Sequence, residues 1–215
     1  MPTRSYNQYC SLAYALDVIG ERWTLLIVRE LMLGPRRFVD LLTNLPGIGR
    51  NLLTARLRHL EQQGLIRRHT LPPPAGARVY ELTAEGGALG PAMAELSRWG
   101  VERLAEPRPS DAFRPAWAMF PLSYMANLEA ASGVQETYEF RIDGDTFHLV
   151  VAEGRVEPNA GPAPAPDAVF EMSPQTIFEL MSGSLAAGEA LATGRVSFDG
   201  DPAALSNALA ILAGE

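Results

Sequence analysis

The sequence predicts an α+β protein of two domains, and three observations lead to this prediction. The first hundred residues show apolar residues at helical spacing followed by a hairpin pattern, whereas the remainder mixes strand and helix patterns. A stretch rich in proline and charge, AEPRPSDAFRP (105–115), separates these two parts. Charge is also divided, with 12 arginines and 8 acidic residues up to Gly100 but 6 arginines and 17 acidic residues beyond it. We therefore expect a first domain over 1–106, a linker over 107–115 and a second domain over 116–215.

Composition indicates a globular protein without a membrane span. The 215 residues are 47% hydrophobic and 20% charged, and no run reaches the roughly eighteen apolar residues that a span needs. The N-terminal MPTRSYNQYC lacks the apolar core of a secretion signal, and a single cysteine excludes an internal disulfide framework. These features predict a cytoplasmic protein. The net charge of -7 does not argue against nucleic acid as a partner, because the first domain is locally basic.

The first domain is expected to contain four helices, a two-stranded hairpin and a closing helix. Apolar spacing and the glycine and proline stops place these elements. The helices are YNQYCSLAYALDVIG (6–20), WTLLIVRELMLG (23–34), RRFVDLLTNL (36–45) and GIGRNLLTARLRHLEQQG (47–64); the strands are LIRRHT (65–70) and RVYELT (78–83); Thr83 caps one last helix that runs towards Trp99.

The fourth helix combines a buried stripe with a basic face. Leu53, Leu57 and Leu60 recur at helical spacing and form one apolar stripe. At about 100° per residue, the opposite face carries Asn51, Ala55, Arg58 and Gln62, with Arg50 and Thr54 on its flank. Taken alone, such a face is more simply interpreted as solvated. Arginines at the start of the third helix and on both wing strands change this interpretation, because three elements then contribute to one basic surface.

Three helices, a basic fourth helix and a hairpin make the plan of a winged helix-turn-helix, in which the fourth helix enters the major groove of DNA. Arginine pairs bidentately with guanine edges or phosphates, asparagine pairs with adenine, and threonine contacts a thymine methyl or a phosphate. The sequence therefore predicts double-stranded DNA as a partner.

The motifs of this domain resemble those of the HxlR family of bacterial transcriptional regulators. The likeness runs from about Tyr9 to Gly100 and includes Trp23, GPRRF, LPGI, LTARL and YELT in the family's order. It implies a homodimer formed through the terminal helices, around 9–19 and 89–104, that reads a near-palindromic operator, and we expect a repressor. The DNA-contacting residues are expected to be Arg36, Arg37, Arg50, Asn51, Thr54, Arg58, Arg67, Arg68 and Arg78. Arg56 belongs to the motif, but its angle near the core flank predicts a structural or phosphate role.

The second domain is expected to layer helices on a mostly antiparallel curved sheet. ETYEFRID and TFHLVVAE alternate apolar and polar residues around an Asp143-Gly144 turn, and RVEP, AVFEM and RVSFDG supply further strands. The closing run FELMSGSLAAGEALATGRVSFDGDPAAL resembles the sterol-carrier-protein-like fold, which implies an apolar tunnel for hydrophobic molecules. The cavity residues are expected to be Trp117, Tyr138, Phe140, Phe147, Phe170, Phe178 and Met181. The alternative for these side chains is plain core packing.

Catalysis has little support in the sequence, and no enzyme activity, cofactor or metal is expected. His59, His69 and His148 are far apart, and no cluster has the spacing of zinc ligands. A lipid carrier or a hydrolase in the second domain is a weaker alternative. Redox sensing through Cys10 is another, because some HxlR relatives carry a reactive cysteine near this place. The simpler interpretation of Cys10 is a buried, inert thiol.

Overall fold

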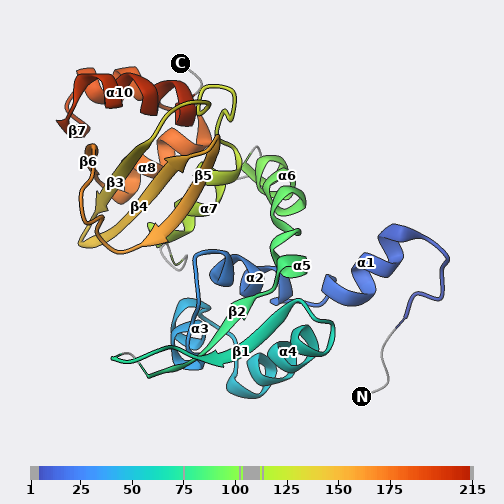
Figure 1. The fold of residues 1–215 in the computed structure, drawn as a ribbon. Coiled ribbons are helices and arrows are strands. Elements are labelled where there is room, and N and C mark those ends of the chain that lie inside the picture. The colour runs from blue at the N-terminus through green and yellow to red at the C-terminus, as the bar shows by residue number, and fades with distance from the viewer. Residues whose placement is uncertain (1–4, 75, 102, 104–111, 113, 214–215) are drawn as a thin grey trace. The chain divides into compact units, whose positions relative to one another are not determined.

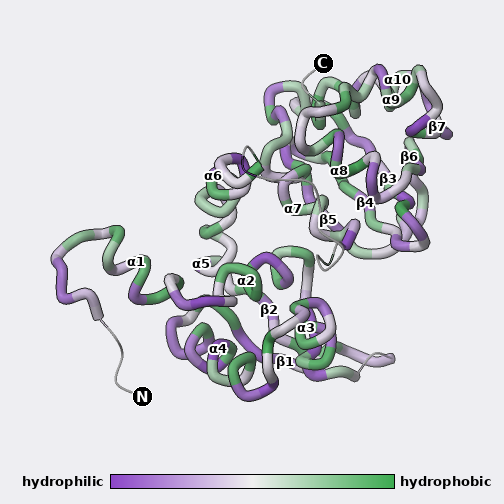
Figure 2. Tube along the Cα trace, turned by 180° about the vertical axis from the view of Figure 1, so that it is seen from behind, coloured by the Kyte–Doolittle hydropathy of each residue, from purple (hydrophilic) through white to green (hydrophobic). Residues whose placement is uncertain are grey.

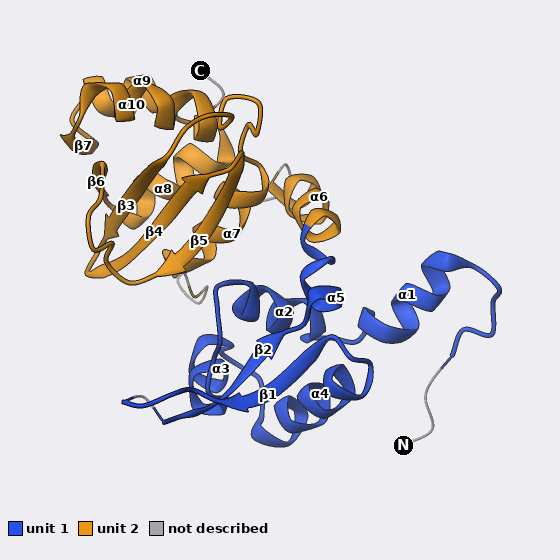
Figure 3. Cartoon of the chain, viewed as in Figure 1, with its two compact units in different colours: residues 1–90 blue, residues 91–215 orange. Residues whose placement is uncertain are grey.

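The computed structural model describes residues 5–74, 76–101, 103, 112 and 114–213. The chain divides into two compact units, residues 1–90 and 91–215 (Figures 1 and 3). Most of the expected linker, 107–115, lies outside the described residues, so its boundaries stay a prediction.

The first unit is a small helical body with a two-stranded wing (Figure 1). Its strands pair antiparallel, with Thr70 opposite Arg78 and Ile66 opposite Leu82. Its elements are α1 (Ser11–Ile19), α2 (Thr24–Met32), α3 (Phe38–Asn44), α4 (Arg50–Gln62), β1 (Ile66–Thr70), β2 (Arg78–Leu82) and α5 (Ala84–Gly87).

The core of this unit forms around the apolar stripe of α4. Leu53, Leu57 and Leu60 are fully buried, as their spacing predicts. Ile27 and Leu41, from α2 and α3, are equally buried. The stripe thereby determines which face of α4 is turned to solvent.

The single closing helix expected after Thr83 is divided in two. Thr83 does cap α5, accepting a hydrogen bond from the Gly86 amide at 3.1 Å, but α5 ends at Gly87. A new helix, α6 (Gly90–Val101), then begins. Pro91 explains the break, because proline lacks an amide proton and its ring would clash with the carbonyl four residues earlier. Gly86 and Gly87 weaken helical continuity further.

The second unit layers helices on a five-stranded sheet (Figure 1). The strand order is β5-β4-β3-β6-β7, and every pair is antiparallel except β3 with β6. This arrangement confirms the predicted mostly antiparallel sheet. Its elements are α7 (Ala116–Tyr124), β3 (Glu136–Ile142), β4 (Asp145–Ala152), β5 (Arg155–Ala160), β6 (Ala168–Met172), α8 (Pro174–Ser182), α9 (Ala187–Ala192), β7 (Val196–Gly200), α10 (Pro202–Ala208) and a π-helical turn, η1 (Leu209–Ala213).

One face of the sheet forms the core of the second unit. Tyr138 and Phe140 on β3, and Phe147 and Leu149 on β4, are all buried, as their alternation predicts, and the alternation can be followed in Figure 2. Glu139 departs from this pattern, because its side chain points to the other face yet is only 2% exposed. Its carboxylate accepts hydrogen bonds from Arg141 Nε and the Ala163 amide, each at 2.7 Å. Those two donors compensate for its burial.

Candidate functional sites

The exposed face of α4 carries the residues predicted to contact DNA. Arg50, Asn51, Thr54 and Arg58 are all exposed, on the side of the helix away from the buried leucines. The Thr54 hydroxyl donates to the Arg50 carbonyl at 2.8 Å. Within the described part of the chain, Arg50 and Arg58 form no ion pair, so their guanidinium groups are available to an anion.

Arg56 differs from its neighbours on the same helix. Its guanidinium pairs with Glu21 at 2.7 Å and donates to the Arg22 carbonyl at 3.3 Å. Its side chain is also mostly buried. These contacts tie α4 to the segment before α2, which fits the structural role that its angle on the helix predicts.

The wing arginines are partly engaged with carboxylates. Arg67 pairs with Glu81 at 2.8 Å across the strands, and Arg68 pairs with Glu61 at 2.9 Å. The Glu61 hydrogen bond raises the pKa of Arg68. Arg78 is exposed and forms no ion pair among the described residues. The first two side chains are therefore held along the wing, and phosphate would have to share them with carboxylates.

Arg36 and Arg37 have structural contacts that the sequence prediction missed. Arg36 extends the wing, because its backbone exchanges hydrogen bonds with Tyr80 at 3.0 and 2.8 Å. Its guanidinium also donates to the Leu33 carbonyl at 3.1 Å. Arg37 precedes α3 and pairs with Asp40 at 2.8 Å, which lowers the pKa of that carboxyl. The Asp40 carboxylate also accepts a hydrogen bond from the Arg37 amide at 3.0 Å, at the start of α3.

A polar hollow of about 480 Å³ lies on the wing, lined by Arg68, Arg78, Thr70, His69 and Glu61. Two of these residues, Arg68 and Arg78, are among those predicted to contact DNA. Thr70 joins them because it lies opposite Arg78 in the hairpin register. Two arginines in one hollow favour an anion such as a phosphate.

The second unit contains an apolar cavity of about 470 Å³. Among the described residues, all of the side chains that line it are apolar, so the polar part of its lining comes from the backbone. Its walls come from β3, β6 and β7 and from five helical segments, α6, α7, α8, α9 and α10 with its π-helical turn. Its size lies within the roughly 300–1,000 Å³ of small-molecule pockets.

Three of the predicted cavity residues line the cavity: Phe140, Phe170 and Met181. Trp117, Tyr138, Phe147 and Phe178 do not line it. Phe147 stacks against Phe140, with ring centroids 5.0 Å apart, and so packs against a residue that lines the cavity.

Tyr138 is enclosed in a polar network behind the cavity. Its hydroxyl donates to Glu136 at 2.6 Å, and Asn207 of α10 donates to the same carboxylate at 2.7 Å. Burial and the neighbouring carboxylate raise the pKa of Tyr138. Tyr138 and Phe140 share one face of β3, yet only Phe140 lines the cavity. Periodicity alone therefore cannot separate residues that line the cavity from residues that pack around it.

Residues after α8 form a wall that aromatic patterning did not reveal. Gly183, Leu185 and Leu191 all line the cavity, and all three belong to the motif shared with sterol-carrier-like proteins. The signal that could have found them was therefore the motif itself. Gly183 adopts φ 72°, the left-handed conformation that ends α8.

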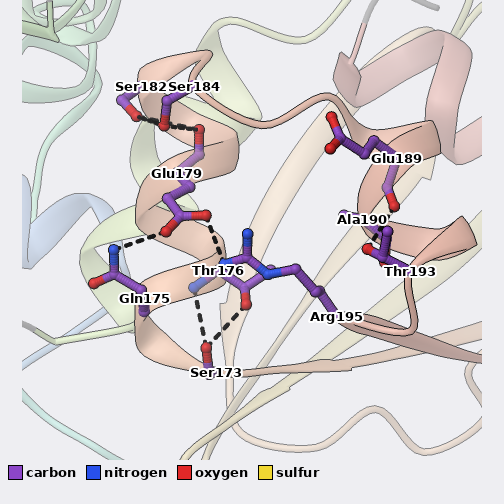
Figure 4. A network of polar contacts seen from close by, with 10 residues as sticks. All are labelled: Ser173, Gln175, Thr176, Glu179, Ser182, Ser184, Glu189, Ala190, Thr193 and Arg195. Atoms are coloured by element: carbon purple, nitrogen blue, oxygen red, sulfur yellow. Dashed lines mark hydrogen bonds and ion pairs between the residues drawn. The ribbon is translucent and has the colours of Figure 1, made fainter.

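An ion pair connects the two sides of this wall (Figure 4). Arg195, just before β7, pairs with Glu179 of α8, whose carboxylate also accepts from Gln175 Nε2 at 2.8 Å. Both donors lower the pKa of Glu179, with Gln175 the larger cause. The Ser182 and Ser184 hydroxyls donate to the Glu179 carbonyl, at 3.1 and 3.2 Å. These contacts close a loop around the segment that includes Leu185 and Leu191.

The remaining candidate groups are dispersed. His59 Nε2 lies 3.0 Å from the Val18 carbonyl, and His148 Nδ1 lies 2.9 Å from the Gly161 carbonyl. The described residues include no cluster of His, Cys, Asp and Glu that could hold a metal ion. In that same set, no helix is both long and apolar enough to span a membrane. Cys10, immediately before α1, is exposed rather than buried.

Comparison with known families assigns two parts of the chain, and the first match extends past Gly90 to include α6. Residues 18–107 match the HxlR-like helix-turn-helix model. Residues 121–212 match the SCP-2 sterol transfer family. The protein is thus a winged helix-turn-helix domain followed by an SCP-2 domain.

The first part of the chain is similar to several transcriptional regulators. The HTH-type transcriptional regulator YvaP of Bacillus subtilis is 36% identical over 88 residues, which are 41% of this chain and 82% of YvaP. YodB of the same organism is 36% identical over 47% of this chain and 90% of its own length. A Mycobacterium tuberculosis regulator, Rv3095, is 46% identical over 45% of this chain, but only 61% of that protein is covered. The solved reduced form of YodB is 33% identical, covers 47% of this chain and 99% of its own, and has a TM-score of 0.40. The chain belongs to the HxlR family of helix-turn-helix transcriptional regulators.

We predict that Arg195→Ala lowers the melting temperature at neutral pH and that this difference disappears in acid. Folding depresses the pKa of Glu179 below its ordinary value of 4.5. A carboxyl of this kind stabilises the fold above its unfolded-state pKa and loses that contribution as the pH falls through the folded-state pKa. The difference in melting temperature should therefore be constant from about pH 7 to 5 and shrink below about pH 4.

Circular dichroism melts across this pH range would test the prediction. Arg155→Ala is the matched control, since Arg155 is exposed on β5 and forms no ion pair within the described residues. A difference between wild type and Arg195→Ala that persisted unchanged at low pH would contradict the role given to Glu179.

Proposed function

We propose that this regulator is a homodimeric repressor whose SCP-2 domain senses a small, uncharged hydrophobic ligand. The observation that carries the proposal is the cavity lined by apolar side chains, in a chain whose other unit is a helix-turn-helix. Such a cavity offers a ligand site without any residue suited to catalysis on its lining.

In this proposal α4 reads bases and the arginines around it hold phosphates. Arg50, Asn51, Thr54 and Arg58 supply the donors and the methyl group that base edges require. The backbone contacts come from Arg36, Arg37, Arg67, Arg68 and Arg78. Support comes from the exposure of the α4 residues and from the free guanidinium groups of Arg50 and Arg58.

Exposed apolar side chains support the proposed homodimer. On α1, Leu12 and Tyr14 are well exposed, and Leu16 is partly so. On α6, Leu96 and Trp99 are exposed as well. Large apolar side chains gathered on one helix commonly mark a protein contact, and a two-fold dimer suits a near-palindromic operator.

The ligand is proposed to be uncharged for two reasons. A buried ion needs a partner, and none of the described side chains on the cavity lining is charged. The chain beyond Gly100 is also strongly acidic, with 17 acidic residues and 6 arginines, which disfavours the approach of an anion.

Removing either free arginine of α4 should weaken specific DNA binding. Arg58→Ala and Arg50→Ala are each expected to lose roughly 1–3 kcal/mol, about 5- to 150-fold in Kd. The measurement is a gel-shift titration at fixed salt with a duplex that the wild type selects from random sequence. Arg155→Ala removes the same charge from the second unit and should bind like the wild type. Wild-type affinity in both α4 variants would refute the assignment of α4.

The cavity should prefer a neutral chain to its anionic counterpart. We expect 1-dodecanol to bind the full-length protein at least roughly tenfold more tightly than dodecanoate at pH 8, as measured by displacement of N-phenyl-1-naphthylamine. The reason is that a buried carboxylate would lack a charged partner. The readout is the fluorescence of the displaced probe. Equal affinities for dodecanol and dodecanoate would contradict the proposal that the ligand is uncharged. If neither compound binds, and the probe does not bind either, the proposal that this domain senses a ligand is contradicted.

Thiol-based control through Cys10 is a second candidate, favoured by the exposure of this side chain. A chain with one cysteine can form a disulfide only with another molecule, so Cys10 would pair either with Cys10 of a second copy or with a small thiol.

Mild diamide treatment is then expected to change DNA affinity in the wild type but not in Cys10→Ser. Non-reducing electrophoresis would show the linked dimer, and gel shifts before and after reduction would show its effect. Identical DNA binding by the oxidised and reduced wild type would remove this candidate.

A further inference from the structure

We propose that α6 transmits occupancy of the cavity to the dimer surface, with Val101 as the residue that reports the ligand. This inference rests on the proposed function, because it describes how the sensing unit would control DNA binding. It adds a particular helix and a particular contact.

One continuous helix, α6, carries both exposed apolar side chains and a residue of the cavity wall. α6 runs without interruption from Gly90 to Val101. Gly90 is the last residue of the first unit, and Val101 lines the cavity of the second (Figure 3). A helix is held together by its own backbone hydrogen bonds, so a displacement at one end moves the rest of it.

The two functions of α6 lie on opposite faces. Leu96 is 53% exposed and Trp99 60%, and these are the side chains proposed to meet a second copy. At about 100° per residue, Val101 points roughly 140–160° away from both. Movement of Val101 outward from the cavity would therefore carry Leu96 and Trp99 with it.

The end of α6 is also ordered around Trp99. Arg103 donates to the Trp99 carbonyl at 2.7 Å, and its guanidinium carbon lies 3.9 Å from the centroid of the indole ring. A guanidinium over an aromatic face is attractive, so Trp99 is held while its outer side remains exposed. The side chain of Trp99 in the proposed contact surface therefore has a defined position, which a movement of α6 would change.

The other walls of the cavity are braced within the second unit. Phe140 lies between Phe147 and Phe170, with ring centroids 5.0 and 5.3 Å away. The opposite wall is closed by the Glu179–Arg195 ion pair (Figure 4). α6 contributes Val101 to the cavity wall and carries the exposed side chains proposed to meet a second copy, so a ligand that displaces Val101 would also move that surface. The ligand can shift DNA affinity only by as much as its own affinity differs between two positions of α6.

The test compares the ratio of DNA Kd values with and without saturating N-phenyl-1-naphthylamine in full-length proteins. The wild-type ratio should differ from one by at least about fivefold, the lower range of allosteric coupling. Val101→Ala should bring the ratio to within about twofold of one, because the ligand loses its contact with α6. Leu191→Ala removes a comparable contact from α9 and is the matched control. It should weaken probe binding yet keep the wild-type ratio at saturation.

Val101→Trp provides an independent check, since its larger side chain should shift ligand-free DNA affinity in the direction that the probe shifts the wild type. If Val101→Ala keeps the wild-type ratio, or both alanine variants lose it equally, the role of α6 is overturned while the sensor survives. If the wild type binds the probe but its ratio is one, sensing of the ligand fails and this inference fails with it. Circular dichroism melts confirm that each variant is folded.

Discussion

The burial of three leucines on α4 is the constraint on which the DNA-binding unit depends. Leu53, Leu57 and Leu60 are buried and form one apolar stripe, and they are the residues of α4 that the core encloses. Rotation of α4 by one residue, about 100°, would expose a leucine and bury an arginine. Packing of apolar side chains therefore directs Arg50 and Arg58 outward, although neither touches the core. The Arg56–Glu21 ion pair works in the same sense, since it ties the helix down at its flank.

A comparable relation holds in the second unit, where a layer of aromatic rings is both core and floor. Phe147 stacks beside Phe140 from the neighbouring strand β4, and Phe140 in turn lines the cavity. A cavity lined by apolar side chains persists only if its surroundings are stiff enough not to collapse into it. Stacked rings on one side and the Glu179–Arg195 pair on the other supply that stiffness.

How far the sequence predicts this molecule can be judged from particular residues. Apolar spacing located nearly every helix and strand, because burial of one face is a local property of helices and strands. It failed at Pro91, where one backbone clash divided the expected closing helix. It also failed at Glu139, whose burial depends on a donor from a loop 24 residues away. The arginines on α4 are exposed as expected, whereas the carboxylate partners of Arg37, Arg67 and Arg68 emerge only from the fold. Aromatic pattern could not separate lining from support, since Tyr138 and Phe140 share a strand face.

The uneven charge of the chain limits how a ligand could control it. Electrostatic attraction to phosphates supplies most non-specific DNA affinity, and an acidic second domain can add nothing to that term. An uncharged ligand in an apolar cavity changes no charge either, so it cannot act by neutralising or creating a phosphate contact. What remains is geometry: the spacing of two α4 helices in a dimer decides whether both enter successive turns of the groove. The proposed control by a neutral ligand would therefore pass through an element that sets the proposed dimer, and α6 is the helix to which we assign that role.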